Sequence, residues 1–237
     1  MVVWLFAGGG ESEVRGLVPF LEKNFAGCTF ERKTPIRQKP GPKPPKNRAE
    51  SAYGKSGKSL QQQIKRQLSV ALKQAKCDLI LVVDDLDCHD AEEQEKRFLQ
   101  TILSVPGTTN IKKFVGFAAP ELEAWLIADW NNTIAKDVDF RKEHQAMRWW
   151  LSSQANVPFD APESFSVYDP AKDACKHKLS DAIIESANLK ANARYSKAIH
   201  TPRLIQTIEP TIVSQKCPFF RQLYTYLSEF CREERQS

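Results

Sequence analysis

Three aspartates follow directly on an apolar run in LILVVDDLDC, residues 79–88. Asp84, Asp85 and Asp87 end a segment whose composition is typical of a buried parallel strand. Carboxylates this close repel one another, and each loses hydration when it is partly buried, so a compensating positive charge is expected. Because no Lys or Arg lies within four residues of Asp85 or Asp87, we interpret this pair as ligands of Mg²⁺ or Mn²⁺.

Acidic residues also follow the two neighbouring strands that the sequence predicts: Glu11 and Glu13 after strand 2–6, and Glu121 and Glu123 after strand 113–118. In a parallel sheet the carboxyl ends of the strands meet at one edge, where ligands bind. These acids could therefore join Asp85 and Asp87 around one cation. The alternative is that they lie at helix starts and complement the helix dipole, which explains Glu11 and Glu121 well.

Helical spacing separates the two acids after strand 113–118. If a helix runs from Glu121 to Trp130 with Pro120 in its first turn, Glu121 and Glu123 lie about 200° apart around the axis. We therefore expect them to face different ways. Glu121 is predicted to be a solvated acid near the start of the helix, and Glu123 to face the carboxyl edge of strand 79–83.

The elements that must position these residues alternate along the first 135 residues. The predicted strands are 2–6, 28–30, 79–83 and 113–118, and the predicted helices between them are 11–24, 59–75 and 92–105. The remaining pattern is helical: 141–153, 173–187, 202–213 and 217–232. We predict an α/β fold with a mostly parallel sheet flanked by helices. Residues 1–135 would form the core, with a basic flexible loop at 34–58, and residues 136–237 a helical extension packed on it.

Positive charge is concentrated in residues 32–58, the basic segment. It contains nine cationic residues against one acid, Glu50: Arg32, Lys33, Arg37, Lys39, Lys43, Lys46, Arg48, Lys55 and Lys58. The segment has a net charge of +8. The whole chain has a net charge of +5, so the residues outside the segment sum to −3. We interpret the segment as a contact for the phosphate backbone of DNA or RNA, independent of base sequence. The alternative is a solvated segment without function.

The cysteines and the amino-terminal residues indicate the cellular compartment in which we expect the protein. Six cysteines are scattered through the 237 residues without a CxxC pair. No charged signal-peptide start and no long apolar run is present. We therefore expect a cytoplasmic protein with free thiols and no membrane partner. A zinc site from Cys88-His89 and Cys175-x-His177 is an alternative whose spacing matches no structural class.

Two other motifs resemble ligand-binding sites, but we do not interpret them as such. GKSGKS (54–59) resembles the end of a P-loop, but Ala52 stands where the first glycine belongs and no apolar strand precedes it. Trp149-Trp150 could stack nucleic-acid bases. Paired tryptophans are more often one core residue and one surface residue, which is the interpretation that we favour.

A strand that ends in a hydrophobic-D-x-D sequence, preceded by a glycine-rich junction carrying acids, resembles the Toprim domain of topoisomerases, primases and OLD-type nucleases. The whole chain resembles a bacterial family known as domain of unknown function 4276. The segments that carry the resemblance are GGGESEVRGLVPFL (8–21), VVDDLD (82–87), AAPELEAWLIAD (118–129), YSKAIH (195–200) and CPFFRQL (217–223). They span most of the chain, and ELEAWLIAD is the most specific of them.

The resemblance implies a magnesium-dependent nuclease with an ATPase partner in antiphage defence. Asp85 and Asp87 would bind the metal, Glu123 would lie near them, and Lys197 would approach the scissile phosphate. The usual Toprim glutamate is replaced here by Ala7, so Glu11 or Glu13 would have to reach the metal and take part in catalysis from the following turn. If neither does, the chain would be a non-catalytic module that binds nucleic acid or the ATPase.

Overall fold

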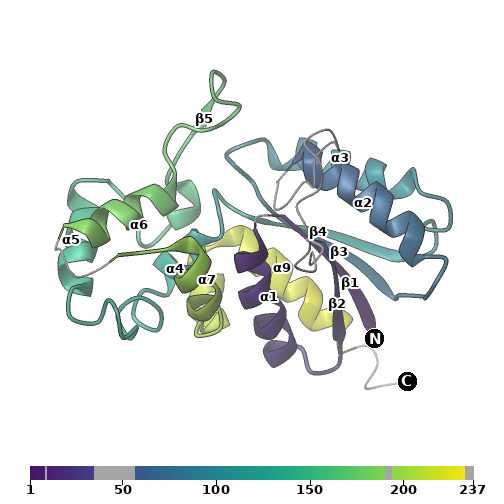
Figure 1. Ribbon diagram of the computed structural model, residues 1–237, viewed down its shortest axis with the longest axis horizontal. Coiled ribbons are helices and arrows are strands. Elements are labelled where there is room, and N and C mark those ends of the chain that lie inside the picture. Colours follow the sequence, from purple (N-terminus) through teal and green to yellow (C-terminus); the bar gives the residue numbers. More distant parts are fainter. Residues whose placement is uncertain (9, 35–56, 190–193, 233–237) are drawn as a thin grey trace, which may run out of the picture.

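A four-stranded parallel sheet organises the protein (Figure 1). The structure, a computed structural model, describes residues 1–8, 10–34, 57–189 and 194–232, with residues 11–14 described by their backbone alone. The strands are β1 (Val2–Ala7), β2 (Thr29–Thr34), β3 (Leu79–Asp85) and β4 (Lys112–Ala118). Their order is β2-β1-β3-β4, and every neighbouring pair is parallel. The expected α/β class is therefore confirmed.

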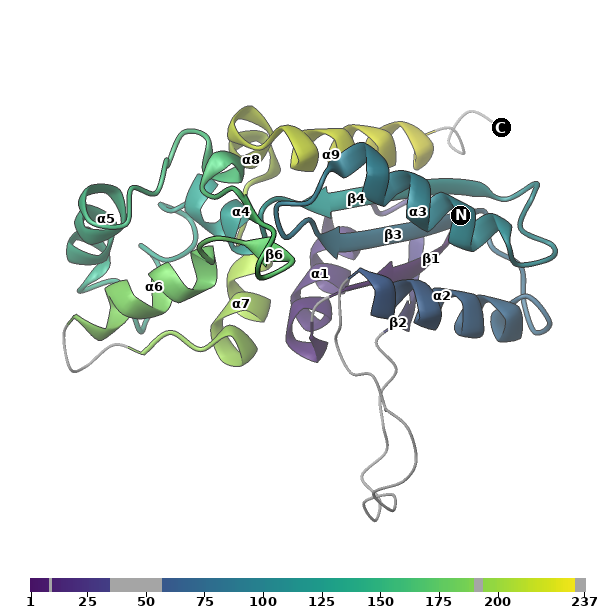
Figure 2. The ribbon, with the colours of Figure 1, turned by 90° about the horizontal axis from the view of Figure 1, so that it is seen from above.

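Helices cover both faces of the sheet because its inner strands are apolar on both sides. On one face α2 (Lys58–Ala71) and α3 (Ala91–Leu103) pack over Trp4, Phe6 and Val82. On the other face α1 (Glu11–Asn24) and α9 (Pro218–Phe230) pack over Leu5 and Leu81. Figure 2 shows these helices running alongside the strands. The last helix of the chain is thus part of the sheet's own packing.

The chain between β4 and α9 is mainly helical and lies at the carboxyl ends of the strands (Figure 2). Its elements are α4 (Glu123–Ala128), α5 (His144–Ser153), the 3₁₀ helix η1 (Pro162–Ser164), the hairpin strands β5 (Tyr168–Asp169) and β6 (Ala174–Cys175), α6 (Leu179–Asn188), α7 (Lys197–Ile205) and α8 (Pro210–Lys216). Helix α7 packs against α1. A Cβ on Gly16 of α1 would lie 2.6 Å from the carbonyl oxygen of Pro202 in α7, so a glycine there allows the close approach.

Several predicted element bounds are wrong. The predicted helix 173–187 begins only at Leu179, because residues 174–175 pair with β5. The predicted helix 202–213 is two helices, since Pro210 has no N–H to continue a helix and starts α8 instead. The predicted helix from Glu121 begins at Glu123. Most of the expected loop, residues 35–56, lies outside the described residues.

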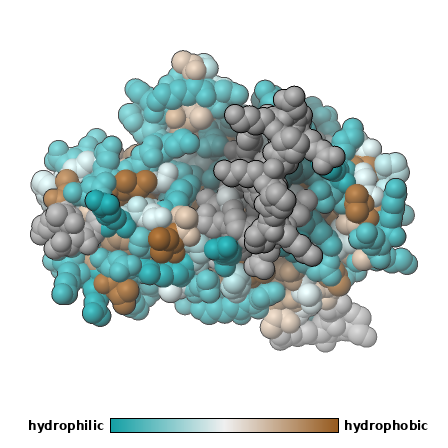
Figure 3. All heavy atoms as spheres, viewed as in Figure 1, coloured by the Kyte–Doolittle hydropathy of each residue, from teal (hydrophilic) through white to brown (hydrophobic). Residues whose placement is uncertain are grey.

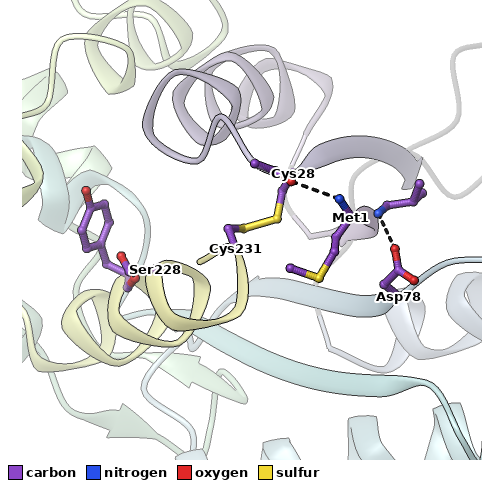
Figure 4. The surroundings of a disulfide bond; sticks show 8 residues. Met1, Cys28, Asp78, Ser228 and Cys231 are labelled. Carbon is purple, nitrogen blue, oxygen red and sulfur yellow. Dashed lines mark hydrogen bonds between the residues drawn. A yellow bond between two sulfur atoms is a disulfide. The ribbon is translucent and has the colours of Figure 1, made fainter. Parts of the chain in front are cut away.

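Two disulfide bonds contradict the expectation of free thiols. Cys28 bonds to Cys231 across 203 residues, and Cys88 bonds to Cys175 across 87 residues. The first joins the turn after α1 to the end of α9, beside Met1 (Figure 4). The second uses the two cysteines of the zinc alternative, which is therefore also wrong. Such long separations leave no local spacing signal, and folding alone brings the partners together.

Within the described residues, no helix combines the length and the apolar composition that a membrane span requires.

Candidate active site

The carboxyl edge of the sheet is the place where the predicted site residues gather. Ala7 pairs with Val83 and Asp85 pairs with Ala118, so β1, β3 and β4 end side by side. The N–H of Gly8 donates to the carbonyl oxygen of Val83 at 2.8 Å and keeps the chain at this edge after β1. The segments that follow these three strands are therefore neighbours.

Asp84 points to the face of the sheet covered by α2 and α3. It is 3% exposed, and its Oδ2 accepts a hydrogen bond of 2.8 Å from the backbone N–H of Gly57, just before α2. Its Oδ1 fills the space where a side chain on Gly8 would lie, so residue 8 must lack a Cβ. Burial raises the pKa of Asp84 to about 7, although the Gly57 N–H lowers it.

Asp85 points to the opposite face, because neighbouring residues of a strand alternate. This half-buried side chain accepts a hydrogen bond of 3.0 Å from the backbone N–H of Leu122 through Oδ1. Burial raises the pKa of Asp85 well above its usual range. The Lys197 ammonium lowers that pKa, and the carboxylates of Glu121 and Glu123 raise it further. These four charged groups therefore share one site.

Glu121 is a buried acid that joins the sheet edge to the helical part. It is 5% exposed. Its carboxylate accepts hydrogen bonds from the backbone N–H of Ser180 at 2.6 Å and from its Oγ at 2.9 Å, in the first turn of α6. The Nζ of Lys197 lies 3.2 Å from the same carboxylate. Its negative charge is thus stabilised by a helix amino terminus and by an ammonium group.

Glu123 is fully buried and faces the same lysine. Its Oε2 lies 3.1 Å from Nζ of Lys197, and its Oε1 accepts a hydrogen bond of 3.0 Å from Oγ1 of Thr201. The hydroxyl of Tyr195 lies 2.7 Å from the same Oγ1. Since the Thr201 hydroxyl donates to Glu123, the Tyr195 hydroxyl must donate to Thr201. Both hydroxyl groups hold Glu123 in place.

The expected orientation of the two glutamates is therefore wrong. Glu121 and Glu123 converge on Lys197, and Glu121 is not a solvated acid. The reason is that α4 begins only at Glu123, so Glu121 precedes the helix. The helical angle between positions 121 and 123 does not apply there.

Three other expected residues stand differently. Asp87 is half-buried, with φ of 48°, and its backbone N–H donates to the carbonyl oxygen of Pro120 at 2.9 Å. Its charge raises the pKa of Asp85, so Asp87 lies near the site. Glu11 and Glu13 belong to the first turn of α1, but their side chains lie outside the described residues.

The donor chemistry of the cluster suits magnesium, since Asp85, Asp87 and Glu123 offer carboxylate oxygens. Among the described residues, however, no group of three or more His, Cys, Asp or Glu side chains could hold a metal ion. The ammonium of Lys197 contacts Glu123 as well as Glu121. The described side chains alone therefore do not form the metal site that the sequence predicted.

The expected nucleic-acid contacts are described only in part. Lys33 lies 2.8 Å from Glu31 and places its ammonium 4.5 Å from the centre of the Trp4 ring. Arg32 lies beside it in β2, and Lys58 is exposed at the start of α2. The other expected contacts lie outside the described residues: Arg37, Lys39, Lys43, Lys46, Arg48 and Lys55.

A second ion network fixes the helix that carries Lys197. Arg203 of α7 donates two hydrogen bonds of 2.6 Å to Asp137 and one of 2.6 Å to Asp139. His200 of α7 lies 3.3 Å from Asp139. Sequence reasoning missed this network, and it missed Ser180, Thr201 and Tyr195. The one signal in the sequence was the YSKAIH segment, in which Tyr195 precedes Lys197 by two positions.

The sequence model of a family described as Domain of unknown function (DUF4276) matches residues 10–228. The chain belongs to this family. The match includes every acid of the cluster and Lys197, so the expected family is confirmed. No curated protein and no solved structure matches the chain. The function proposed for this chain therefore rests on its own site.

Proposed function

We propose that the protein is a Toprim-type hydrolase that cleaves phosphodiester bonds of DNA or RNA with Mg²⁺ or Mn²⁺. The observation that carries this proposal is the convergence of Asp85, Glu121 and Glu123 on Lys197 at the carboxyl edge of a parallel sheet. Ligands of open parallel sheets bind at this edge. Buried carboxylates with a strongly raised pKa are typical of functional sites.

The proposed roles follow from the contacts. Asp85 and Asp87, with Glu123 beside them, would bind the metal together with Glu11 or Glu13 from the first turn of α1, because no three of the described acids could hold an ion by themselves. A bound Mg²⁺ supplies charge neutralisation and lowers the pKa of bound water. Thr201 and Tyr195 orient the Glu123 carboxylate. Lys197, which lies 3.1 Å from Glu123, would offer its ammonium to a phosphate oxygen.

The charge distribution along the sequence favours a polar, anionic ligand. The basic segment carries +8, and contacts between Lys or Arg and phosphates supply affinity without base choice. The face drawn in Figure 3 is mainly hydrophilic, with hydrophobic residues scattered over it. Scattered apolar residues do not make a broad apolar interface. An ATPase partner in antiphage defence follows from the resemblance alone.

A second candidate function is a module that binds nucleic acid or an ATPase without catalysis. The observation that favours it is the lack of a three-ligand metal group among the described residues. Ala7, at the end of β1, also stands where Toprim nucleases carry a glutamate. In this candidate the contacts of Lys197 with Glu121 and Glu123 only hold the helical part on the sheet.

A cleavage assay separates the two candidates. Wild-type protein is incubated with labelled single-stranded and double-stranded DNA and RNA, in Mg²⁺, in Mn²⁺ and in EDTA. If the protein is a hydrolase, we expect metal-dependent cleavage, and Glu123→Gln should reduce its rate by at least about a hundredfold. The matched control is Glu185→Gln, which removes one exposed carboxylate from α6. If the protein binds nucleic acid but cleaves no substrate in either metal, the hydrolase proposal is wrong and the non-catalytic module is supported.

A further inference from the structure

A cleft opens directly beside Asp85 and Asp87. Its volume is about 1040 Å³. The start of α2, the β3–α3 connection, α3 and the β5–β6 hairpin line it. Among the residues that line it are Lys58, Asp87, His89, Arg97, Tyr168 and Asp173. Sequence reasoning gave no part to Tyr168 and considered His89 only for the zinc alternative.

An aromatic pair stands in the wall of this cleft. The ring centres of His89 and Tyr168 lie 5.1 Å apart with an angle of 48° between the planes. Tyr168 is 40% exposed, so the residue is accessible from solvent. Its hydroxyl donates a hydrogen bond of 2.7 Å to Oδ1 of Asp173 at the hairpin turn, which fixes the direction of the ring.

The second disulfide holds the two halves of this pair together. Cys88 directly precedes His89, and its partner Cys175 is paired with Tyr168 across the hairpin. The bond therefore joins the chain just after Asp87 to the strand opposite Tyr168. Figure 2 shows β6 beside the end of β3.

The charges of the lining favour bases over phosphates inside the cleft. Asp90 accepts a hydrogen bond from the N–H of Glu93, and Glu93 pairs with Arg97 at 2.6 Å. Asp84, Asp85 and Asp87 add further acids to the wall. An aromatic ring stacks on the π-face of any base, whatever the charge around it. The exposed Lys58 lies at the wall, where it can meet the backbone of a strand.

We infer that the cleft binds unpaired bases of single-stranded nucleic acid, with the His89–Tyr168 pair as the stacking platform. The inference rests on the proposed function for its ligand class and adds that the site takes an open strand. A cleft of this volume has the size of a small-molecule pocket, about 300–1,000 Å³. It has room for about one or two unstacked nucleotides.

The test separates bases from charge. Affinity is measured in EDTA for a labelled thymidine oligonucleotide of about eight residues, for an abasic oligonucleotide of equal length and charge, and for a duplex. We expect the thymidine strand to bind at least about tenfold more tightly than the abasic strand. Tyr168→Ala should remove this preference and Tyr168→Phe should keep it, because a phenyl ring still stacks.

Two further variants make the result specific. Trp149→Ala removes a tryptophan that is 63% exposed on α5, and it should leave the base preference unchanged. The double variant Cys88→Ser/Cys175→Ser should lower the preference, because it releases the hairpin. Circular dichroism confirms that each variant is folded. His89→Ala is the second probe of the platform should Tyr168→Ala fail to fold.

The outcomes distinguish this inference from the proposed function. Equal affinity for thymidine and abasic strands, or a preference that survives both Tyr168→Ala and His89→Ala, would overturn the inference even if the protein cleaves DNA or RNA. Loss of the preference in Trp149→Ala instead would place the platform on α5 and overturn it as well. The base preference could be lost in Tyr168→Ala while the wild-type protein shows no metal-dependent cleavage. That outcome would support base binding in the cleft and contradict the proposed hydrolase activity.

Discussion

Single side chains at the sheet edge carry different parts of the site. Glu121 accepts hydrogen bonds from the first turn of α6, whereas Glu123 is held by Thr201 and faces Lys197. The first arrangement joins two parts of the fold. The second orients one carboxylate toward a cation. We therefore assign Glu121 mainly to stability and Glu123 mainly to chemistry.

This division predicts losses of stability of different size for two matched substitutions. Glu121→Gln loses the charged acceptor of the α6 amino terminus and should lower the free energy of unfolding by about 1–3 kcal/mol. Glu123→Gln should cost less stability, because Lys197 keeps Glu121 as its partner. Urea unfolding monitored by tryptophan fluorescence measures both. A larger loss for Glu123→Gln would reverse the assignment.

Gly8 and Asp84 form a second residue-scale pair. A methyl group at position 8 would overlap the Asp84 carboxylate, so Gly8→Ala should destabilise the fold by about 1–3 kcal/mol. In the Asp84→Ala background the overlap disappears, and the same substitution should cost clearly less. The four proteins form a double-mutant cycle measured by urea unfolding. Additive effects would show that the carboxylate is not what excludes the methyl group.

Among the elements, η1 and α9 are joined by one titratable contact. Glu163 of η1 accepts hydrogen bonds from the backbone N–H groups of Phe219 at 3.0 Å and Phe220 at 3.3 Å, at the start of α9. Burial raises the pKa of Glu163 to about 7, while the two N–H groups lower it. The folded protein therefore holds a proton on Glu163 where the unfolded chain has released it.

The pH dependence of stability follows from this difference. Between about pH 4.5 and 7 the folded state binds more protons at this group than the unfolded state, so the Glu163 contribution to stability falls as pH rises. The fall should be on the order of 1–2 kcal/mol, after allowance for partial exposure. Glu163→Gln, which still accepts an N–H, should have a flatter stability profile over this window. Identical pH profiles for the two proteins would contradict the assignment.

At the scale of the whole molecule, two disulfides connect distant parts of the chain. The Cys28–Cys231 bond closes a loop of 203 residues, which restricts the unfolded chain strongly. Reduction, or Cys28→Ser/Cys231→Ser, should lower the free energy of unfolding by about 2–5 kcal/mol. Peptide mapping without reductant should recover both pairs and leave Cys77 and Cys217 as thiols. Four further thiols in the native protein would contradict the disulfides.

The basic segment is a whole-molecule feature because it carries a net charge of +8, whereas the rest of the chain sums to −3. Replacing residues 35–56 by a short neutral linker should weaken nucleic-acid binding and flatten its salt dependence, since fewer counterions are released. The slope of log affinity against log salt should fall by about 0.9 for each duplex phosphate that the protein no longer neutralises. A linker of equal length is the control. An unchanged slope would show that the segment does not contact the nucleic-acid phosphates.

The sequence by itself determined the parallel sheet, the bounds of α1 and the edge at which the acids gather. These features depend on local signals, namely apolar runs, helical spacing and the alternation of strands with helices. The family resemblance added Lys197 as a neighbour of the acids and supported Glu123, and the structure brings Lys197 to Asp85, Glu121 and Glu123.

The tertiary structure alone decided how the acids are used. Glu121 and Ser180 are 59 residues apart, Glu123 and Thr201 are 78 apart, and the disulfide partners are 203 and 87 apart. No local spacing encodes contacts at such separations. Glu121 precedes the first residue of α4 and contacts Lys197, and the packing of α7 on α1 positions Thr201. Because these contacts form only when the helical part closes on the sheet edge, the sequence could place the acids but not assign their partners.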